Sequence, residues 1–385
     1  MDDRFDLVII GGGLAGLSLA AGLVRGGYEG RVVIIEPRKE YVDDRSWSFW
    51  TAAGEAMPVA AVRRWDRWQF SRQGGEPVTC SAEGFRYAYV RSLDFYRAAL
   101  KLITSRSNFT LVLGDKAGAI TRNGDHSSVA TSTAALSARF VVDTRPATVD
   151  KFSRSIMFQS FAGRELTFDE PRFDDSRIEL MTDMRSDALG FVFSYVLPLS
   201  PTHALVEATR FSTHPLGRTQ LSADLDQLLF SRGWSQATVL RTEGAVLPMG
   251  LPVAKVSKPT PGVVHAGQGA GALRAASGFG FLRIQAWADR CARALLQGRP
   301  PLGHPAEPMV RGLMDQVFLR ALTNNPERSA EFFLRLATSV SGAAFVRFMS
   351  DRGGLLDYTS IVKALPPGPF LQALRGQLHG PGPLA

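Results

Sequence analysis

The clearest pattern of hydrophobic and polar positions lies in residues 6–36, DLVIIGGGLAGLSLAAGLVRGGYEGRVVIIE. The uninterrupted apolar run at residues 7–10 has the length and composition of a buried strand. Residues 17–25 continue with apolar side chains at helical spacing, and a second apolar run at residues 32–35 ends in Glu36. This order predicts a strand, a helix and a second, parallel strand.

Three glycines, Gly11, Gly13 and Gly16, fill a G-x-G-x-x-G template between the first strand and the helix. The first permits a tight turn, the second lets the backbone approach a pyrophosphate, and the third lets helix and strand pack closely. The helix N-terminus offers free N–H groups to the phosphates, and Glu36 would accept hydrogen bonds from the ribose. We therefore expect a dinucleotide site, the alternative being a plain βαβ unit with a glycine-rich turn. The motif does not separate NAD from FAD, but its N-terminal position favours FAD by analogy with flavoproteins.

The following segments alternate between strands and connections. Residues 41–50 read as a loop rich in aromatic side chains, and residues 87–100 as a strand that enters an amphipathic helix. Residues 138–147 contain another buried strand, which ends in Asp143. From about 150 to 255 strands with long polar connections predominate, which predicts a sheet-rich insertion.

Residues 262–296 return to strand, glycine loop and helix, and the chain beyond about residue 305 reads as mainly helical. The predicted fold is therefore α/β, with a Rossmann-type nucleotide-binding domain, an inserted sheet-rich substrate domain and a helical C-terminal region. The expected division is 1–150 and 256–300 for the nucleotide-binding domain, 151–255 for the substrate domain, and 301–385 for the helical region.

Composition narrows the class of protein. The chain has 385 residues, with 45% hydrophobic and 21% charged, as in a globular protein, and its two cysteines lie far apart. A net charge of +8 invites nucleic acid or anionic lipid as partner, but the arginines are scattered and no nucleic-acid-binding module is recognisable. The N-terminus lacks the basic region of a signal peptide, and no run of about 18 uncharged apolar residues occurs. We expect a cytoplasmic protein without nucleic acid as partner.

One acidic residue, Glu207, stands in an otherwise apolar and hydroxyl-rich segment, SYVLPLSPTHALVEATRF at residues 194–211. Strand alternation places it on the same face as Leu205, Thr209 and Phe211. Either the strand lies at the edge of a sheet and the carboxylate is solvated, or the carboxylate is held in an apolar place. In the second case, desolvation would raise its pKa and favour the protonated acid.

Several segments together resemble the bacterial lycopene cyclases, FAD-dependent enzymes related to flavoproteins of the aromatic-hydroxylase type. The resemblance covers nearly the whole chain. Its segments are SWSFW at 46–50, SIMFQSFAGRELTF at 155–168, IELMTDM at 178–184, FVFSYVLPLSPTHALVEATRF at 191–211, EGAVLPMG at 243–250, GAGALRAASGFGF at 269–281, EFFLRL at 331–336 and LPPGPFLQAL at 365–374.

The chain also departs from the family pattern. The acidic pair of the family's strand is reduced to Glu207 followed by Ala208, and the His-Pro of the flavin loop is replaced by Arg274-Ala275. The tyrosine of that loop is Phe279, and the usual D-G-R-G is DTRP at residues 143–146. A cyclase that acts on another polyene end group would show the same departures.

The resemblance implies a redox-neutral, acid-initiated cyclisation, an isomerase reaction that closes the linear ends of lycopene into β-rings and gives γ-carotene and β-carotene. It implies reduced FAD as cofactor, with NAD(P)H as the expected reductant. Glu207 matches the family's strand acid and is the expected proton donor. Asp183, on a neighbouring strand, is the second catalytic candidate, because it could orient Glu207 or share its proton; a strand-end aspartate without function is the alternative.

Further site residues follow from motif and resemblance. Arg274 at the flavin loop would favour an anionic reduced flavin, the alternative being a phosphate or surface contact. Aromatic faces stabilise carbocations without offering a nucleophile, so tryptophans and phenylalanines near the loop are candidates for the substrate pocket, although core packing is the default. The cofactor-binding set is Gly11, Gly13, Gly16, Glu36, Asp143, Gly267, Gly271, Arg274 and Gly278, and the pocket set is Trp47, Phe49, Trp50 and Phe279. No metal site is expected.

A substrate dissolved in the bilayer requires membrane contact, so we expect peripheral association with the inner face of the membrane. Residues 331–349 carry phenylalanines and arginines at helical spacing. Such a helix would either lie among the lipid headgroups or cover the protein's own core. Two other activities remain open for the chain: a flavin-dependent monooxygenase or prenyl reductase, and a non-catalytic carotenoid or flavin carrier.

Overall fold

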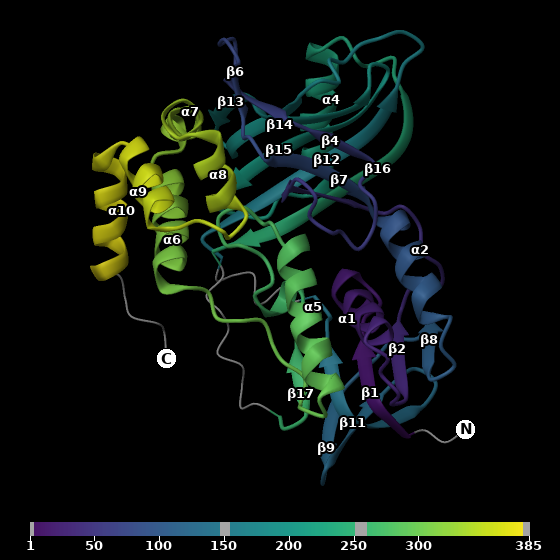
Figure 1. Cartoon of the computed structure of the whole chain (residues 1–385). Coiled ribbons are helices and arrows are strands. Elements are labelled where there is room, and N and C mark those ends of the chain that lie inside the picture. Colours follow the sequence, from purple (N-terminus) through teal and green to yellow (C-terminus); the bar gives the residue numbers. More distant parts are fainter. Residues whose placement is uncertain (1–3, 147–154, 251–259, 380–385) are drawn as a thin grey trace.

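The computed structural model describes residues 4–146, 155–250 and 260–379. The expected domain boundaries at 150/151 and 255/256 lie outside the described residues, and the domain division stays a prediction. Figure 1 shows two large sheets, one above the other, with the C-terminal helices to one side of the upper sheet.

The lower sheet is built around the predicted βαβ unit. Strands β1 and β2 are parallel, α1 connects them, and β11 pairs in parallel with β1 on the other side. Much later in the chain, β17 pairs in parallel with β11, which returns the glycine loop and α5 to this sheet. The elements are β1 (Arg4–Ile10), α1 (Leu14–Arg25), β2 (Val32–Glu36), α2 (Ser92–Ile103), β8 (Phe109–Leu113), β9 (Ile120–Asn123), β10 (His126–Ala130), β11 (Ala135–Asp143), β17 (Val263–His265) and α5 (Phe281–Leu296).

The upper sheet has the strand order β16-β12-β15-β14-β13-β5-β6. Helix α4 packs against β12 and β15 on one face, and the other face looks toward the C-terminal helices. Two of its strands, β5 and β6, come from the N-terminal part of the chain and extend the edge beside β13. The elements are β5 (Arg67–Arg72), β6 (Val78–Ser81), β12 (Met157–Thr167), β13 (Ile178–Asp187), β14 (Gly190–Ser200), β15 (His203–Ser212), α4 (Arg218–Ser231) and β16 (Thr238–Met249).

A third, small sheet lies between the other two and consists of β3 (Ser46–Ala52), β7 (Phe85–Arg91) and β4 (Arg63–Trp65). The prediction of a loop at residues 41–50 is therefore wrong for its second half. Trp47 pairs with Val90, and Phe49 with Ala88, in an antiparallel ladder. The partner strand lies about forty residues away, so local sequence did not indicate the pairing.

The prediction of a helical C-terminal region is confirmed, with α6 (Met309–Asn324), α7 (Ser329–Ser339), α8 (Gly342–Met349), α9 (Leu355–Ala364) and α10 (Pro367–His379). Residues 331–349 do not form one helix, however. A break after α7 bends the chain by 120°, and Ser341 caps α8 by accepting a hydrogen bond from the Ala344 N–H. Phe332 and Phe345 are buried in the core, which favours core packing over headgroup contact for this segment.

Within the described residues, no single helix combines the length and the apolarity that crossing a bilayer requires. The bent pair of α7 and α8 passes that test only when both helices are taken together.

Candidate active site

The glycine loop after β1 has the geometry that its sequence predicts. Gly11 adopts φ +99°, which an L side chain rarely adopts, and a Cβ on Gly16 would lie 1.9 Å from the Gly11 carbonyl oxygen. A Cβ on Gly13 would instead meet only an Arg38 nitrogen, at 3.7 Å. Gly13 is the N-cap of α1 and has no side-chain cap, so the first N–H groups of the helix face open space beside this loop. The loop therefore fits a bound pyrophosphate.

Glu36 closes the opposite side of the loop at the end of β2. Its Oε2 accepts a hydrogen bond of 2.6 Å from the Gly12 N–H, and its Oε1 accepts one of 2.9 Å from Arg38 Nε. Tyr41 donates its hydroxyl to the Gly12 carbonyl oxygen. These bonds fix the buried carboxylate beside the loop, where it fits the ribose contact expected of it.

The remaining cofactor candidates lie around the ends of β11 and β17. Burial raises the pKa of Asp143, but hydrogen bonds from His265 and Arg145 outweigh this and hold it well below its usual range. Asp143 is thus an ionised carboxylate that already has two partners. Gly267 donates its N–H to Nε2 of His304, whose pKa burial and nearby arginines lower to about 4, so that the neutral ring can accept the bond. All three loop glycines have positive φ values: 79° at Gly267, 86° at Gly271 and 68° at Gly278.

A cavity of about 560 Å³ lies between the third sheet, the upper sheet and the C-terminal helices. Trp47, Trp50 and Phe279 line it, as predicted. Phe49 does not: it is 3% exposed and stacks on Phe281 at a centroid distance of 4.6 Å within the core of the lower sheet. Aromatic and aliphatic side chains dominate the lining, so the cavity suits a hydrocarbon.

Glu207 faces this cavity from β15, which is an interior strand between β12 and β14. The explanation of a solvated edge-strand glutamate is therefore wrong, because Glu207 is 8% exposed and both neighbouring strands are paired. Burial raises the pKa of Glu207 well above its usual range, and the charge of Glu243 together with a hydrogen bond shared with it raises it further. A carboxyl group in these surroundings is protonated at neutral pH.

The sheet register explains how two carboxyls meet. Gly163 on the middle strand β12 is the register partner of both Glu207 on β15 and Glu243 on β16. A Cβ on Gly163 would lie 2.8 Å from Cγ of Glu207 and 3.3 Å from Cγ of Glu243. The missing side chain is the space that both glutamates use. On the far side of Glu207, Tyr195 is its register partner on β14 and shares a hydrogen bond of 2.9 Å with the Tyr87 hydroxyl.

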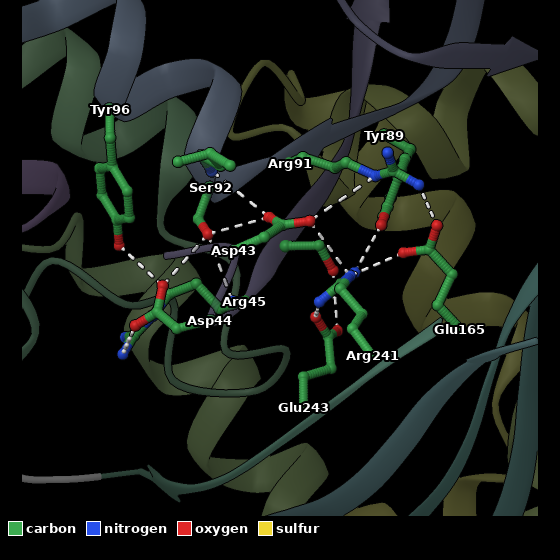
Figure 2. A network of polar contacts seen from close by, with 12 residues as sticks. Asp43, Asp44, Arg45, Tyr89, Arg91, Ser92, Tyr96, Glu165, Arg241 and Glu243 are labelled. Carbon is green, nitrogen blue, oxygen red and sulfur yellow. Dashed lines mark hydrogen bonds and ion pairs between the residues drawn. The ribbon is translucent and has the colours of Figure 1, made fainter. Parts of the chain in front are cut away.

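Glu243 is anchored from outside the cavity, as Figure 2 shows. Arg241 donates from Nη1 to Glu243 Oε2 at 2.5 Å, and Ser46 donates its hydroxyl to Oε1 at 2.7 Å. The same guanidinium donates from Nε to Glu165 Oε2 at 2.6 Å and lies 3.3 Å from Asp43 Oδ2.

The two remaining members of this network are a tyrosine and a second arginine. Tyr89 accepts a hydrogen bond of 2.6 Å from Arg241 Nη2, and Arg91 pairs with Glu165 and, at 3.8 Å, with Asp43. The network joins the strands of the upper sheet to β7 and to the loop before β3.

Asp183 is not close to Glu207. Its Oδ2 accepts hydrogen bonds from Arg232 at 2.8 Å and from the Ser194 hydroxyl at 3.3 Å. Ser194 is the register partner of Ala208, so this side chain lies on the α4 face of the sheet and not on the cavity face. The expectation that Asp183 orients Glu207 or shares its proton is therefore wrong; the carboxyl beside Glu207 is Glu243.

Arg274 lines the cavity but its charge is already paired. Only 2% exposed, it donates from Nε and Nη2 to the two oxygens of Asp315, at 3.1 and 3.0 Å, and to the Phe348 carbonyl oxygen. The guanidinium also lies over the Phe348 ring, with a centroid distance of 4.2 Å. These contacts connect the glycine loop to α6 and α8, which replaces the predicted phosphate or surface contact. The neutralised charge also removes the basis for expecting an effect on a flavin.

Glu243 and Gly163 are the residues that the sequence reasoning missed. Both stand in segments that carry the family resemblance, but neither segment indicates that the two strands are neighbours of β15. The available signal was a glycine within a strand, which often marks a close approach of other groups.

Comparisons with known proteins agree with this geometry. The family model described as "Lycopene cyclase protein" matches residues 6–375. The lycopene beta-cyclase of Pseudescherichia vulneris is 27% identical over 258 residues, which are 64% of this chain and 65% of that protein. The lycopene beta-cyclase of Pantoea ananas is 26% identical over 248 residues, 62% of this chain and 64% of that protein. The matched regions thus span less than two thirds of either relative.

Solved structures show a similar fold at low identity. A geranylgeranyl bacteriochlorophyll reductase-like protein from Thermoplasma acidophilum has a TM-score of 0.61 at 14% identity, covering 97% of this chain and 98% of its own. For a variant of the halogenase PltM in complex with FAD, the TM-score is 0.58 at 13% identity, with 98% and 93% covered. The predicted fold class, a Rossmann-type flavoprotein with a sheet-rich insertion and a helical C-terminal region, is confirmed. With the family match over almost its whole length, the chain belongs to the lycopene cyclase family.

Proposed function

We propose that the protein is a lycopene cyclase that uses bound FAD and closes the linear ends of lycopene into β-rings. The observation that carries the proposal is a buried, protonated carboxyl, Glu207, that faces an apolar cavity of about 560 Å³. An alkene accepts a proton only from an acid that remains protonated at the pH of the reaction, and Glu207 meets this condition.

The glycine loop after β1 and Glu36 would hold the pyrophosphate and ribose of FAD, and the loop of Gly267 and Gly278 lies between that site and the cavity lining. When bound and reduced, for which NAD(P)H is the expected donor of electrons, FAD supplies an electron-rich ring that stabilises positive charge. The cofactor, its reduced state and its reductant are parts of the proposal.

Glu207 begins the reaction by transferring its carboxyl proton to the terminal double bond of the polyene. The neighbouring double bond then attacks the resulting tertiary cation and closes a six-membered ring, and loss of a proton next to the new cation restores an alkene. No electrons are gained or lost overall. Trp50 and Phe279, whose ring centroids are 5.6 Å apart in the cavity wall, present aromatic faces that stabilise a cation without trapping it.

The proposal is tested with purified protein, FAD reduced under anaerobic conditions, and lycopene in lipid vesicles. We expect pigments with one or two β-rings, identified by chromatography and absorption spectra, and no stoichiometric consumption of NAD(P)H. Protein freed of FAD should leave lycopene unchanged. Consumption of NAD(P)H with hydrogenated or oxygenated products would contradict the proposal and indicate a prenyl reductase or monooxygenase, and binding of pigment without turnover would indicate a carrier.

We further propose that the enzyme associates peripherally with the inner face of the cytoplasmic membrane, from which it takes its substrate. Seven large apolar side chains are exposed on three C-terminal helices, and three of them, Leu313, Val362 and Leu371, also line the cavity. We call the seven the mouth patch: Met309, Val310 and Leu313 on α6, Leu355, Leu356 and Val362 on α9, and Leu371 on α10.

Charge favours lipid as the partner of the mouth patch. In the described parts of α6, α9 and α10 the only acidic residues, Asp315 and Asp357, are buried in ion pairs with arginines. The exposed charged side chains include Lys363 and Arg375, which are cationic. An apolar patch with basic residues suits an anionic bilayer surface.

The double change Leu355→Ser and Leu356→Ser is expected to weaken binding to anionic phosphatidylglycerol vesicles at least about tenfold in co-sedimentation, because both leucines would enter the lipid. They are 77% and 84% exposed, so folding should be unaffected. Phe230→Ser on α4, at 79% exposure, is the matched control and should bind like the wild type. Equal binding of all three proteins would exclude the mouth patch as the lipid contact.

A further inference from the structure

Resting on the proposed function, one feature of the cavity wall goes beyond a single acid. Three adjacent strands place Glu243, Gly163 and Glu207 in one row across the sheet. Directly aligned side chains on neighbouring strands lie about 5 Å apart, so glutamates two strands apart would normally be separated by the side chain between them. Here that side chain is absent.

The space at Gly163 is shaped by the two glutamates themselves. A Cβ there would have as nearest atoms Cγ of Glu207, at 2.8 Å, and Cγ of Glu243, at 3.3 Å, both closer than ordinary contact. Both side chains therefore lean over the glycine toward one another. The hydrogen bond between the two carboxyls follows from this arrangement.

Two carboxylates at this distance cannot both be ionised cheaply in an apolar wall, so one of them keeps a proton. The surroundings decide which. Glu243 receives hydrogen bonds from Arg241 and Ser46, which stabilise its charge. Glu207 has only the Tyr195 and Tyr87 hydroxyls on its other side, which carry no positive charge.

The wider charge balance supports a retained proton. Arg241 is shared among Glu243, Glu165 and Asp43, and Arg91 pairs with the same Glu165 and Asp43. Two guanidinium groups therefore face four carboxyls once Glu207 is included. His203 can add one more cation, but it contacts Glu165 at the end of the network away from the cavity and is separated from Glu207 by Arg241.

We propose that Glu243 is a positioning residue that shares one proton with Glu207 across the gap left by Gly163, with Arg241 holding Glu243 in its ionised form. The pair stores the proton that Glu207 delivers to the polyene. When the proton leaves, two adjacent carboxylates remain, and their repulsion favours return of a proton to Glu207 after each turnover.

The test follows the protonation of Glu207 directly, by infrared spectroscopy of the protonated carboxyl band over a pH titration of the FAD-loaded protein without substrate. The band should be absent in Glu207→Gln. In Glu243→Gln it should disappear at a pH about one unit or more below that of the wild type, because the neighbouring negative charge is gone. Gly163→Ala retains both carboxyls but pushes them apart, and should shift the titration in the same direction.

Glu179→Gln is the control, since Glu179 pairs with Arg232 on the α4 face of the same sheet; its titration should match that of the wild type. An unshifted band in Glu243→Gln would overturn the proposal. If that variant fails to fold, the same result in Gly163→Ala decides. The readout needs no turnover, so it separates this proposal from cyclase activity: the band shifts whether or not the protein converts lycopene. In an active enzyme, the alkaline limb of kcat/KM should move with the band.

Discussion

Replacing Glu207 by glutamine is expected to lower the rate of lycopene cyclisation by about 10²- to 10⁴-fold, the usual contribution of a positioned proton donor. The amide has the shape of the acid but cannot donate a proton to an alkene. Lycopene in vesicles, reduced FAD and single-turnover sampling with chromatographic analysis measure the rate of the chemical step. The wild-type rate should itself fall as the pH rises through the pKa of Glu207, which burial and Glu243 raise above its usual range.

Stability provides the control for this change. A carboxyl whose pKa is raised on folding stabilises the folded state most at a pH below its unfolded pKa, and this contribution is lost as the pH rises through the folded value. The amide introduced by Glu207→Gln would have no such dependence and could donate a hydrogen bond to the Glu243 carboxylate. We therefore expect denaturant unfolding of Glu207→Gln to give a free energy equal to or above that of the wild type at alkaline pH. A folded variant that binds FAD and turns over at the wild-type rate would show that another group supplies the proton.

The sequence was sufficient where function depends on local pattern. The strand, glycines, helix and terminal acid of residues 6–36 lie within one short segment, and their geometry follows from steric rules at Gly11 and Gly16. The alternation around Glu207 also assigned the correct side chains to one face, since the strand period is fixed. In both cases the deciding contacts are made within a few residues of the motif or by the family's own motif.

Where contacts join distant segments, sequence alone failed. Asp183 was expected beside Glu207, but a register irregularity in β13 between Thr182 and Arg185 turns it to the opposite face, with φ +51°. Such an irregularity reverses the face of every later residue and has no reliable signature in one sequence. Glu243 was overlooked for the related reason that the neighbours of a strand are set by topology.

Arg274 illustrates a third kind of error. Its place in the flavin loop was read as a charge directed at a cofactor, yet Asp315, forty-one residues further along, neutralises it inside the protein. The residues that pair with a buried charge come from whichever element packs against it, and α6 was only one of several helices that could have done so. The role of Arg274 is thus to connect the cavity wall to the helical region.

Removing one partner of this buried pair is expected to be strongly destabilising. Arg274→Met should lower the free energy of unfolding by about 3–5 kcal/mol, because it leaves the Asp315 carboxylate buried without its counter-charge. The side chains of Arg274 and Asp315 are 1% and 2% exposed, so water cannot replace the lost contacts. Urea unfolding followed by tryptophan fluorescence measures the change, and loss of binding at the mouth patch should accompany it if α6 becomes displaced.

The double change Arg274→Met and Asp315→Leu discriminates between a charge effect and a packing effect. Replacing both partners by apolar side chains of similar size removes the unpaired charge, so most of the lost stability should return. Glu331→Gln is the matched surface control: its pair with Arg335 is exposed, at 35% and 50%, and should cost less than about 1 kcal/mol. If the double variant is no more stable than Arg274→Met, the contacts of the guanidinium with Phe348, and not its charge, hold the glycine loop to the helical region.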